Sequence, residues 1–309
     1  MTSQGAGEAT KPDAIVRRRV DGVVLLDKPS GISSNRALQM VKRAYAALKA
    51  GHTGTLDPLA TGLLPICLGE ATKFAHVLLD STKRYRATVA FGRGTTTGDA
   101  EGEVERTAPV AFEEHDLVAT LVGFVGEITQ VPPRYSALKL HGRNYYEYAR
   151  EGIEIERKPR TVTIHGLQLV SWRPPVAEID VVCSKGSYVR TLAEDIATSL
   201  GSCAHLAALR RTGVGTFDIA DAIDLATLEH ASDHARDARL APPECMVADH
   251  AVFNVGEQDA LALKRGQRVG GQAMPDGCYR CHAPEGFLGL VSIEAGTARA
   301  MRLLRTAGA

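Results

Sequence analysis

Long apolar runs are missing from this sequence of 309 residues. No stretch approaches the roughly 20 apolar residues that a membrane span needs. The first dozen residues, MTSQGAGEATKP, are small and polar and lack the apolar centre of an export signal. We therefore expect a flexible tail over residues 1–20 and a cytoplasmic protein. Apolar residues make up 44% of the chain, which is enough for one large domain and a small companion.

An excess of charge is also missing, because 36 Lys and Arg balance 36 Asp and Glu. A zero sum argues weakly against a nucleic-acid partner, but the charges are unevenly distributed. Residues 1–80 carry ten basic side chains against seven acids, and residues 130–160 carry seven against four. Residues 161–250 carry seven against twelve. A basic face opposite an acidic one would allow RNA binding.

Complete metal and haem motifs are absent. Cys278 and Cys281 form CYRCH with His282, a haem-attachment pattern, but covalent haem needs export. One CxxC supplies two of the four ligands of a structural zinc site, so we interpret the pair as reduced thiols flanking a turn. His230 and His234 are four residues apart with no evident third ligand, which favours a solvated helix face. We predict no metal and no other cofactor.

Familiar catalytic loops are missing too. The phosphate-loop spacing fails after Gly51 and after Gly62, and FGRGTTTGD at 91–99 lacks the third glycine of a dinucleotide fingerprint. No G-x-S-x-G elbow appears. The carboxylate Asp57 has no second acid close to it in the sequence, so the pattern of a glycosidase pair is missing.

What is present is a glycine-rich loop, GHTGTLDP, that carries Asp57 before Pro58. Proline fixes the backbone after Asp57 and biases Asp57 itself towards extended geometry. A rigid loop that presents one carboxylate suits a nucleophile or a base. The alternative is an ordinary Asp-Pro turn whose carboxylate caps a neighbouring amide. The local sequence leaves both interpretations open.

The spacing of apolar residues predicts the elements of the fold. Strands are predicted at 23–26, 63–69 and 83–92, with a hairpin of strands at 161–172 and 177–184. Helices are predicted at 34–50, 70–80, 112–123, 142–152 and 187–201. Because βαβ units do not alternate regularly, we predict an α+β fold with a mixed, largely antiparallel sheet flanked by helices. Short strands between turns predict a small all-β module at 246–309, after a domain at 21–245.

The stretch GHTGTLDPLATGLLP resembles the signature of the pseudouridine synthases of the bacterial TruB type, which modify the T-loop uridine of tRNA. Five further segments between residues 25 and 217 resemble motifs of that family in the family's order: LLDKPSGISSN, KRYRATVAFG, SALKLHGRNYYEYAREG, CSKGSYVRTLAEDI and HLAALRRTGVGTF. The last sixty residues resemble the small RNA-binding PUA barrel that follows the catalytic domain in this family.

The resemblance implies a cofactor-free isomerase that breaks the N1–C1′ bond of uridine 55, turns the base and rejoins it through C5. The family's essential aspartate matches Asp57, as a nucleophile at C1′ or at C6 or as a base at C2′. The active-site tyrosine matches Tyr85, which would stack on the uracil ring and act as the general base that removes the proton from C5. The family's arginine matches Arg190, which would pair with Asp57. An arginine early in a helix opposes the helix dipole, so a nearby anion is expected on physical grounds as well.

Substrate contacts follow from the same resemblance. Tyr188 and Leu209 match residues that line the uridine pocket, and His52 matches a residue that takes the place of the flipped base. Five cations are predicted to contact RNA phosphates: Lys28, Lys73, Lys139, Arg143 and Lys185. The expected partner is the T-arm of tRNA, bound by a monomer that requires no protein partner.

Two functions of other classes remain as alternatives. One is a tRNA-binding or tRNA-folding protein in which chemistry is secondary or absent. The other is a hydrolase or glycosylase acting on a free nucleoside, for which activity on free uridine would be diagnostic. A free-nucleoside enzyme would not need the additional β-module or the basic segments.

Overall fold

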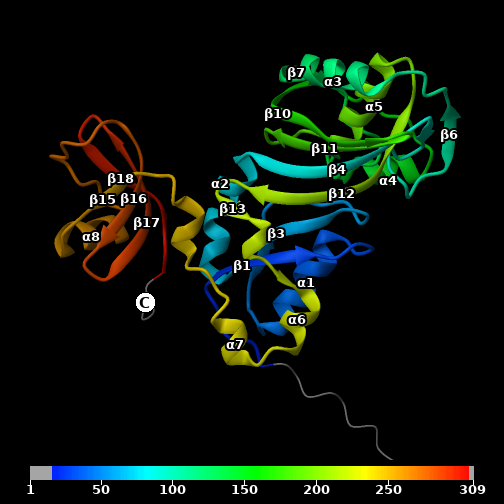
Figure 1. Cartoon of the computed structure of the whole chain (residues 1–309). Coiled ribbons are helices and arrows are strands. Elements are labelled where there is room, and N and C mark those ends of the chain that lie inside the picture. The colour runs from blue at the N-terminus through cyan, green and yellow to red at the C-terminus, as the bar shows by residue number, and fades with distance from the viewer. Residues whose placement is uncertain (1–15, 306–309) are drawn as a thin grey trace, which may run out of the picture.

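A ten-stranded mixed sheet lies at the centre of the larger lobe of the computed structural model, which describes residues 16–305 (Figure 1). Its strands run in the order β14 (Ile223–Asp224), β1 (Gly22–Lys28), β3 (Thr61–Leu68), β12 (Ala204–Val214), β4 (Lys83–Phe91), β11 (Val176–Cys183), β10 (Arg160–Arg173) and β7 (Gly126–Gln130). The short β2 (Ala50–His52) pairs with β3, and β13 (Phe217–Asp218) pairs with β12. The pairs β1–β14 and β12–β3 are parallel and the other pairs of this sheet are antiparallel, which confirms the predicted mixed, largely antiparallel sheet.

Alternating apolar residues explain the long strands in the middle of this sheet. Along β11 every second side chain is buried, as a strand with one face on the core requires. The predicted hairpin is confirmed, because β10 and β11 pair antiparallel from Arg173 opposite Val176 to Ile164 opposite Cys183. Strand β3 is buried on both faces, which fits its continuous run of apolar residues.

Helices cover the sheet at its two ends. The helices α3 (Glu114–Gly123) and α5 (Val189–Ser199) lie beside β10 and β12 in the upper half of Figure 1. The helices α1 (Ser34–Ala44) and α6 (Leu225–His230) lie together beside β1 and β3. The smaller elements are η1 (Gly69–Phe74), α2 (Ala75–Asp80), β5 (Arg93–Thr95), β6 (Val104–Thr107), β8 (Lys139–Leu140), β9 (Arg143–Asn144), α4 (Tyr145–Arg150), η2 (Ile219–Asp221), α7 (Asp233–Asp237) and η3 (Pro243–Val247).

The predicted helix 34–50 is too long, since α1 ends at Ala44. Beyond it, Ala46 has φ of 47°, which a helix cannot contain. The competing interaction comes from the segment before β1. Its Arg18 donates its backbone N–H to the Ala46 carbonyl and accepts the N–H of Leu48. Residues 17–20 are thereby held against the lobe, and residues 1–15 of the predicted tail lie outside the described part of the chain.

The C-terminal module forms a sheet of its own, in the order β15 (Val252–Asn254), β16 (Gly277–Ala283), β17 (Gly286–Glu294) and β18 (Thr297–Leu303). A small C-terminal β-sheet is therefore confirmed, whereas its closure into a barrel stays a prediction. The prediction of an all-β module is wrong, because α8 (Glu257–Lys264) precedes these hairpins. Ala and Leu favour this helix, and two acids in its first turn favour its N-terminus.

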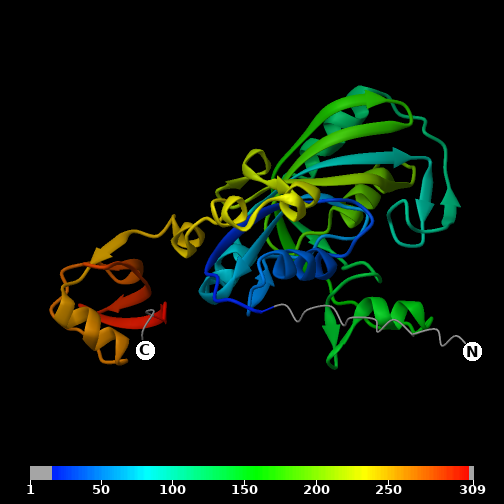
Figure 2. The ribbon, with the colours of Figure 1, turned by 90° about the horizontal axis from the view of Figure 1, so that it is seen from below.

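The module packs on the larger lobe through a mixed contact. The rings of Phe74 in η1 and Phe287 in β17 lie 5.7 Å apart. The Glu244 carboxylate lies 2.9 Å both from the Arg280 guanidinium and from Nε2 of His282. In Figure 2 the module stands to one side of the sheet, joined by the segment that carries η3. Apolar contacts and partly exposed charged groups therefore both fix its position.

The structure also bears on the predictions for two cysteines, two histidines and membrane spans. Cys278 and Cys281 are free thiols, but they lie along strand β16 and do not flank a turn. His230 and His234 belong to separate helices, α6 and α7, so they do not share a helix face. Among residues 16–305, no helix is long and apolar enough to cross a membrane.

Candidate active site

The loop that carries Asp57 connects β2 to β3 and is anchored at both of its sides. The Ser34 hydroxyl, at the start of α1, accepts the N–H of Leu56 at 2.8 Å and donates to the Leu56 carbonyl at 3.0 Å. The Lys28 ammonium is fully buried and donates to the carbonyls of Ile32, Pro29 and, at 3.4 Å, Pro58. These bonds hold the residues on either side of Asp57, so its backbone is fixed before any substrate binds.

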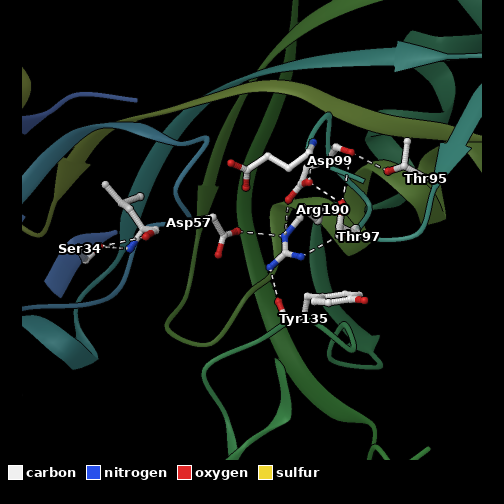
Figure 3. A network of polar contacts seen from close by, with 9 residues as sticks. Ser34, Asp57, Thr95, Thr97, Asp99, Tyr135 and Arg190 are labelled. Atoms are coloured by element: carbon white, nitrogen blue, oxygen red, sulfur yellow. Dashed lines mark hydrogen bonds and ion pairs between the residues drawn. The ribbon is translucent and has the colours of Figure 1, made fainter. Parts of the chain in front are cut away.

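The Asp57 carboxylate faces Arg190, the second residue of α5, with 3.0 Å between Oδ2 and Nε. The Arg190 side chain is 4% exposed and the Asp57 side chain 38% exposed. The two terminal nitrogens of Arg190 donate to the carbonyls of Thr97 at 2.8 Å and Tyr135 at 2.7 Å. Figure 3 shows the guanidinium held between these partners. Arg190 is therefore a fixed cation, whereas Asp57 also reaches the surface.

A second carboxylate faces the same guanidinium. Asp99 Oδ2 lies 3.7 Å from Arg190 Nε, and its side chain is 5% exposed. The Thr97 hydroxyl donates to the other Asp99 oxygen at 2.5 Å (Figure 3). Burial raises the pKa of Asp57 above its ordinary value; Arg190 opposes this shift and Asp99 adds to it. A carboxylate with a raised pKa is a stronger base and nucleophile once ionised.

Tyr85 lies on β4, opposite Arg211 of the neighbouring strand β12. Arg211 is 1% exposed and donates from Nε to the Leu63 carbonyl at 2.7 Å and from a terminal nitrogen to the Gly54 carbonyl at 3.2 Å. Burial raises the pKa of the Tyr85 hydroxyl, and the adjacent Arg211 guanidinium opposes that shift. Arg211 thus connects the strand of Tyr85 with the loop of Asp57.

A glycine makes this arrangement possible. Gly62 has φ of 100°, and a Cβ atom there would lie 2.3 Å from the Arg211 carbonyl oxygen. The parallel pairing of β3 with β12, which brings Arg211 opposite Gly62, therefore has no room for a side chain at this position.

The predicted pocket residues Tyr188 and Leu209 lie on different elements. Tyr188 is the N-cap of α5. Its backbone is clamped by the buried Gln130 amide, which accepts the Tyr188 N–H at 3.0 Å and donates to its carbonyl at 3.2 Å. The Arg160 guanidinium lies over the Tyr188 ring, 4.6 Å from its centroid. Leu209 is 8% exposed in β12 and shares its strand face with Arg211.

His52 ends β2, at the edge of the same loop. Its Nδ1 atom is buried and has no hydrogen-bond partner in the described part of the chain. Burial lowers the pKa of His52, and the Arg211 guanidinium lowers it further. The imidazole is therefore neutral near pH 7, which suits stacking on a base.

The predicted phosphate contacts have unequal positions. The prediction for Lys28 is wrong, because its ammonium is enclosed by the carbonyls that hold the Asp57 loop. Lys73 is bonded to Glu70 and to the Leu303 carbonyl, so it contributes to the contact between lobe and module. Arg143 forms ion pairs with Glu147 and Glu151, and Lys185 forms one with Asp80. Lys139 is exposed and has no acidic partner among residues 16–305.

Sequence reasoning missed three residues of this site: Asp99, Gln130 and Arg211. Asp99 ends the loop 91–99, which the sequence suggested only as a failed nucleotide motif. The available signal for Arg211 was a charged side chain on the inward face of an alternating strand. Gln130 carried no comparable signal. Among residues 16–305, no group of three or more His, Cys, Asp or Glu is arranged to hold a metal ion.

Comparisons with known proteins identify the family of this chain. Residues 42–189 match the family model described as TruB family pseudouridylate synthase (N terminal domain), and residues 190–248 match tRNA pseudouridylate synthase B C-terminal domain. The tRNA pseudouridine synthase B of Methylobacillus flagellatus is 51% identical over 296 residues, covering 95% of this chain and 98% of the relative. That of Thiobacillus denitrificans is 52% identical over 291 residues, covering 94% and 98%.

A solved structure supports the fold. A chain in the crystal structure of a Cbf5-Nop10-Gar1 complex superposes with a TM-score of 0.70 at 24% identity, covering 92% of this chain and 84% of that one. Sequence identity above 50% over nearly the whole length of two relatives decides the family. This chain therefore belongs to the TruB family of pseudouridylate synthases.

Proposed function

We propose that this enzyme converts uridine 55 in the T-loop of tRNA to pseudouridine, with Asp57 as the essential nucleophile or base. The observation that carries the proposal is the ion pair of 3.0 Å between Asp57 and the buried Arg190. The pair keeps one carboxylate oxygen directed at the guanidinium while the side chain remains partly exposed to a substrate. The relatives named tRNA pseudouridine synthase B support tRNA as the substrate.

The proposed reaction is an isomerisation that needs no net oxidant or proton. The N1–C1′ bond breaks, the base turns and a C5–C1′ bond forms. C5 loses a proton and N1 gains one, so the product has the composition of the substrate. Asp57 attacks C1′ or C6 or removes a proton at C2′, and Tyr85 stacks on the base and removes the proton from C5. Arg190 stabilises the Asp57 carboxylate in each version.

Around this centre we assign the substrate contacts. Tyr188 and Leu209 line the uridine pocket, and His52 takes up the stacking that the flipped base leaves. Lys73, Lys139, Arg143 and Lys185 remain proposed phosphate contacts. Residues 21–245 are proposed as the catalytic domain and 246–309 as a PUA-like RNA-binding domain, of which 306–309 lie outside the described residues. The separate sheet and the separate apolar cluster of the C-terminal module support this division.

The test is the release of tritium from unmodified tRNA labelled with [5-³H]uridine, without added metal or nucleotide. The wild type should release tritium, and the modified nucleotide should map to the T-loop. Asp57→Asn should bind the RNA and release none, whereas the matched variant Asp249→Asn, at an exposed aspartate, should behave as the wild type. RNA binding without release by the wild type would favour a tRNA-folding function. Release by Asp57→Asn would remove Asp57 from the chemistry.

A further inference from the structure

Helix α1 and the segment before β1 present a group of cations that the proposed chemistry does not use. From Lys28 to Leu56 the sequence contains no Asp or Glu, and α1 itself carries Arg36, Lys42 and Arg43. Arg36 and Arg43 are exposed and seven residues apart, so they lie on one face of the helix. The exposed Arg17 lies beside the end of α1, where it donates to the Ala47 carbonyl at 3.2 Å. We call Arg17, Arg36, Lys42 and Arg43 the α1 basic surface.

The α1 basic surface has no acidic partner among residues 16–305. Of the 35 Lys and Arg side chains in that range, twelve form ion pairs, including the neighbouring Arg18, which is paired with Asp237. The four cations therefore repel one another without local compensation. Such a group raises the local concentration of a polyanion and is stabilised when one binds.

Three of these four cations border a hollow of about 130 Å³, which is lined by Arg17, Gln39, Lys42, Arg43 and Ala46. A hollow of this size can admit a phosphate group. It is too small to bury a protein segment. Its lining of cations and one amide supplies hydrogen-bond donors for phosphate oxygens.

Helix α1 starts beside the proposed active site. Helix α1 begins at Ser34, whose hydroxyl holds Leu56 beside Asp57. Its 11 residues extend about 16 Å from that point. In Figure 2, α1 (blue) and the segment with α4 (green) both lie below the sheet.

We propose that Arg17, Arg36, Lys42 and Arg43 bind the phosphate backbone of the RNA substrate outside the nucleotide that enters the active site. This proposal rests on the proposed function, since it takes the substrate to be RNA. Cations on an exposed helix and on the adjoining segment offer charge without base-specific contacts, so this surface positions the RNA and does not read its sequence.

The experiment measures the dissociation constant for unmodified tRNA over a range of salt concentrations. Arg36→Gln/Arg43→Gln is compared with Arg93→Gln/Arg173→Gln, which removes two exposed cations elsewhere. Loss of two phosphate contacts should lower the slope of log affinity against log salt by about 1.5 and weaken binding roughly tenfold at low salt. The rate at saturating tRNA should be unchanged, and Arg36→Lys/Arg43→Lys should keep the wild-type slope.

A wild-type slope in Arg36→Gln/Arg43→Gln would overturn the proposal. So would an equal loss of slope in the Arg93→Gln/Arg173→Gln control, because the effect would then be one of net charge. Binding of the wild type to vesicles of anionic lipid, with unchanged tRNA binding by the variant, would assign the surface to a membrane instead. Failure of the wild type to release tritium would overturn the proposed function but not the binding result.

Discussion

The Nε atom of Arg190 lies 3.0 Å from Asp57 Oδ2 although the two residues come from a loop at one edge of β3 and from the first turn of α5. The same atom lies 3.7 Å from Asp99 Oδ2. One buried cation thus faces two carboxylates. Because taking ions out of water is costly, the buried Arg190 and the buried Asp99 depend on each other, whereas Asp57 is partly solvated.

Arg190→Met should lower both stability and activity. It leaves the buried Asp99 without its cation, which costs about 3–5 kcal/mol of unfolding free energy. It also removes the group that opposes the rise in the pKa of Asp57, so the acid limb of the pH–rate profile should move to higher pH. Urea unfolding and single-turnover kinetics from pH 5 to 9 measure both effects.

The double variant Arg190→Met/Asp99→Asn separates the contribution of Arg190 to stability from its contribution to the reaction. Neutralising Asp99 should restore part of the lost stability without restoring the rate. An Arg190→Met enzyme with the wild-type pH profile would show that the ion pair does not control the ionisation of Asp57.

Asp57→Asn should stabilise the protein at neutral pH. The pKa of Asp57 is raised in the folded state, so the folded state favours the protonated form. That contribution is fully present below the unfolded pKa and is lost as the pH rises through the folded value. The asparagine variant avoids this loss, by up to about 1 kcal/mol because the side chain is partly solvated. The melting temperatures of the wild type and Asp57→Asn should converge as the pH falls towards 4. A difference between them that grows on acidification would contradict a raised pKa for Asp57.

Arg211→Lys should slow the reaction more than it weakens RNA binding. Lysine keeps the charge but cannot donate to the Leu63 and Gly54 carbonyls in the fixed geometry of a guanidinium. A buried carbonyl left unsatisfied costs about 1–3 kcal/mol. Arg210→Lys is the matched control, because Arg210 is the adjacent residue and pairs with Asp27 near the surface. The test is to measure the melting temperature, kcat and KM of both variants. Equal effects in the two variants would show that the hydrogen bonds of Arg211 to the loop are not needed for the reaction.

Lys28→Met should destabilise the protein without changing the salt dependence of tRNA binding. Its ammonium is buried against backbone carbonyls, so its loss should cost about 2–4 kcal/mol. The exposed Lys139→Met should do the opposite, with little change in stability and a slope lower by about 0.7–0.9. A fall of that size in Lys28→Met, measured in a protein that remains folded, would restore Lys28 as a phosphate contact.

The predictable helices and strands are those that bury one face in the core, because this burial gives them a regular spacing of apolar residues. The strand at 83–91 and the hairpin of β10 and β11 alternate, and α5 carries a stripe of apolar residues, so local sequence predicts them. The length of α1 was not predictable in this way. The residues after Ala44 have good helix propensity, but the segment around Arg18 takes their backbone hydrogen bonds.

At the site, local sequence predicts the unusual loop around Asp57, and the family resemblance adds five residues: Tyr85, Arg190, Tyr188, Leu209 and His52. Tertiary structure alone decided that Asp99 faces Arg190, that Gln130 clamps Tyr188 and that Arg211 joins two strands to the loop. It also decided that Lys28 is buried and not exposed. A single charged residue leaves no periodic pattern in the sequence, so its surroundings cannot be predicted from the residues next to it. Its role depends on which distant groups desolvate or pair with it, and only the folded chain brings those groups together.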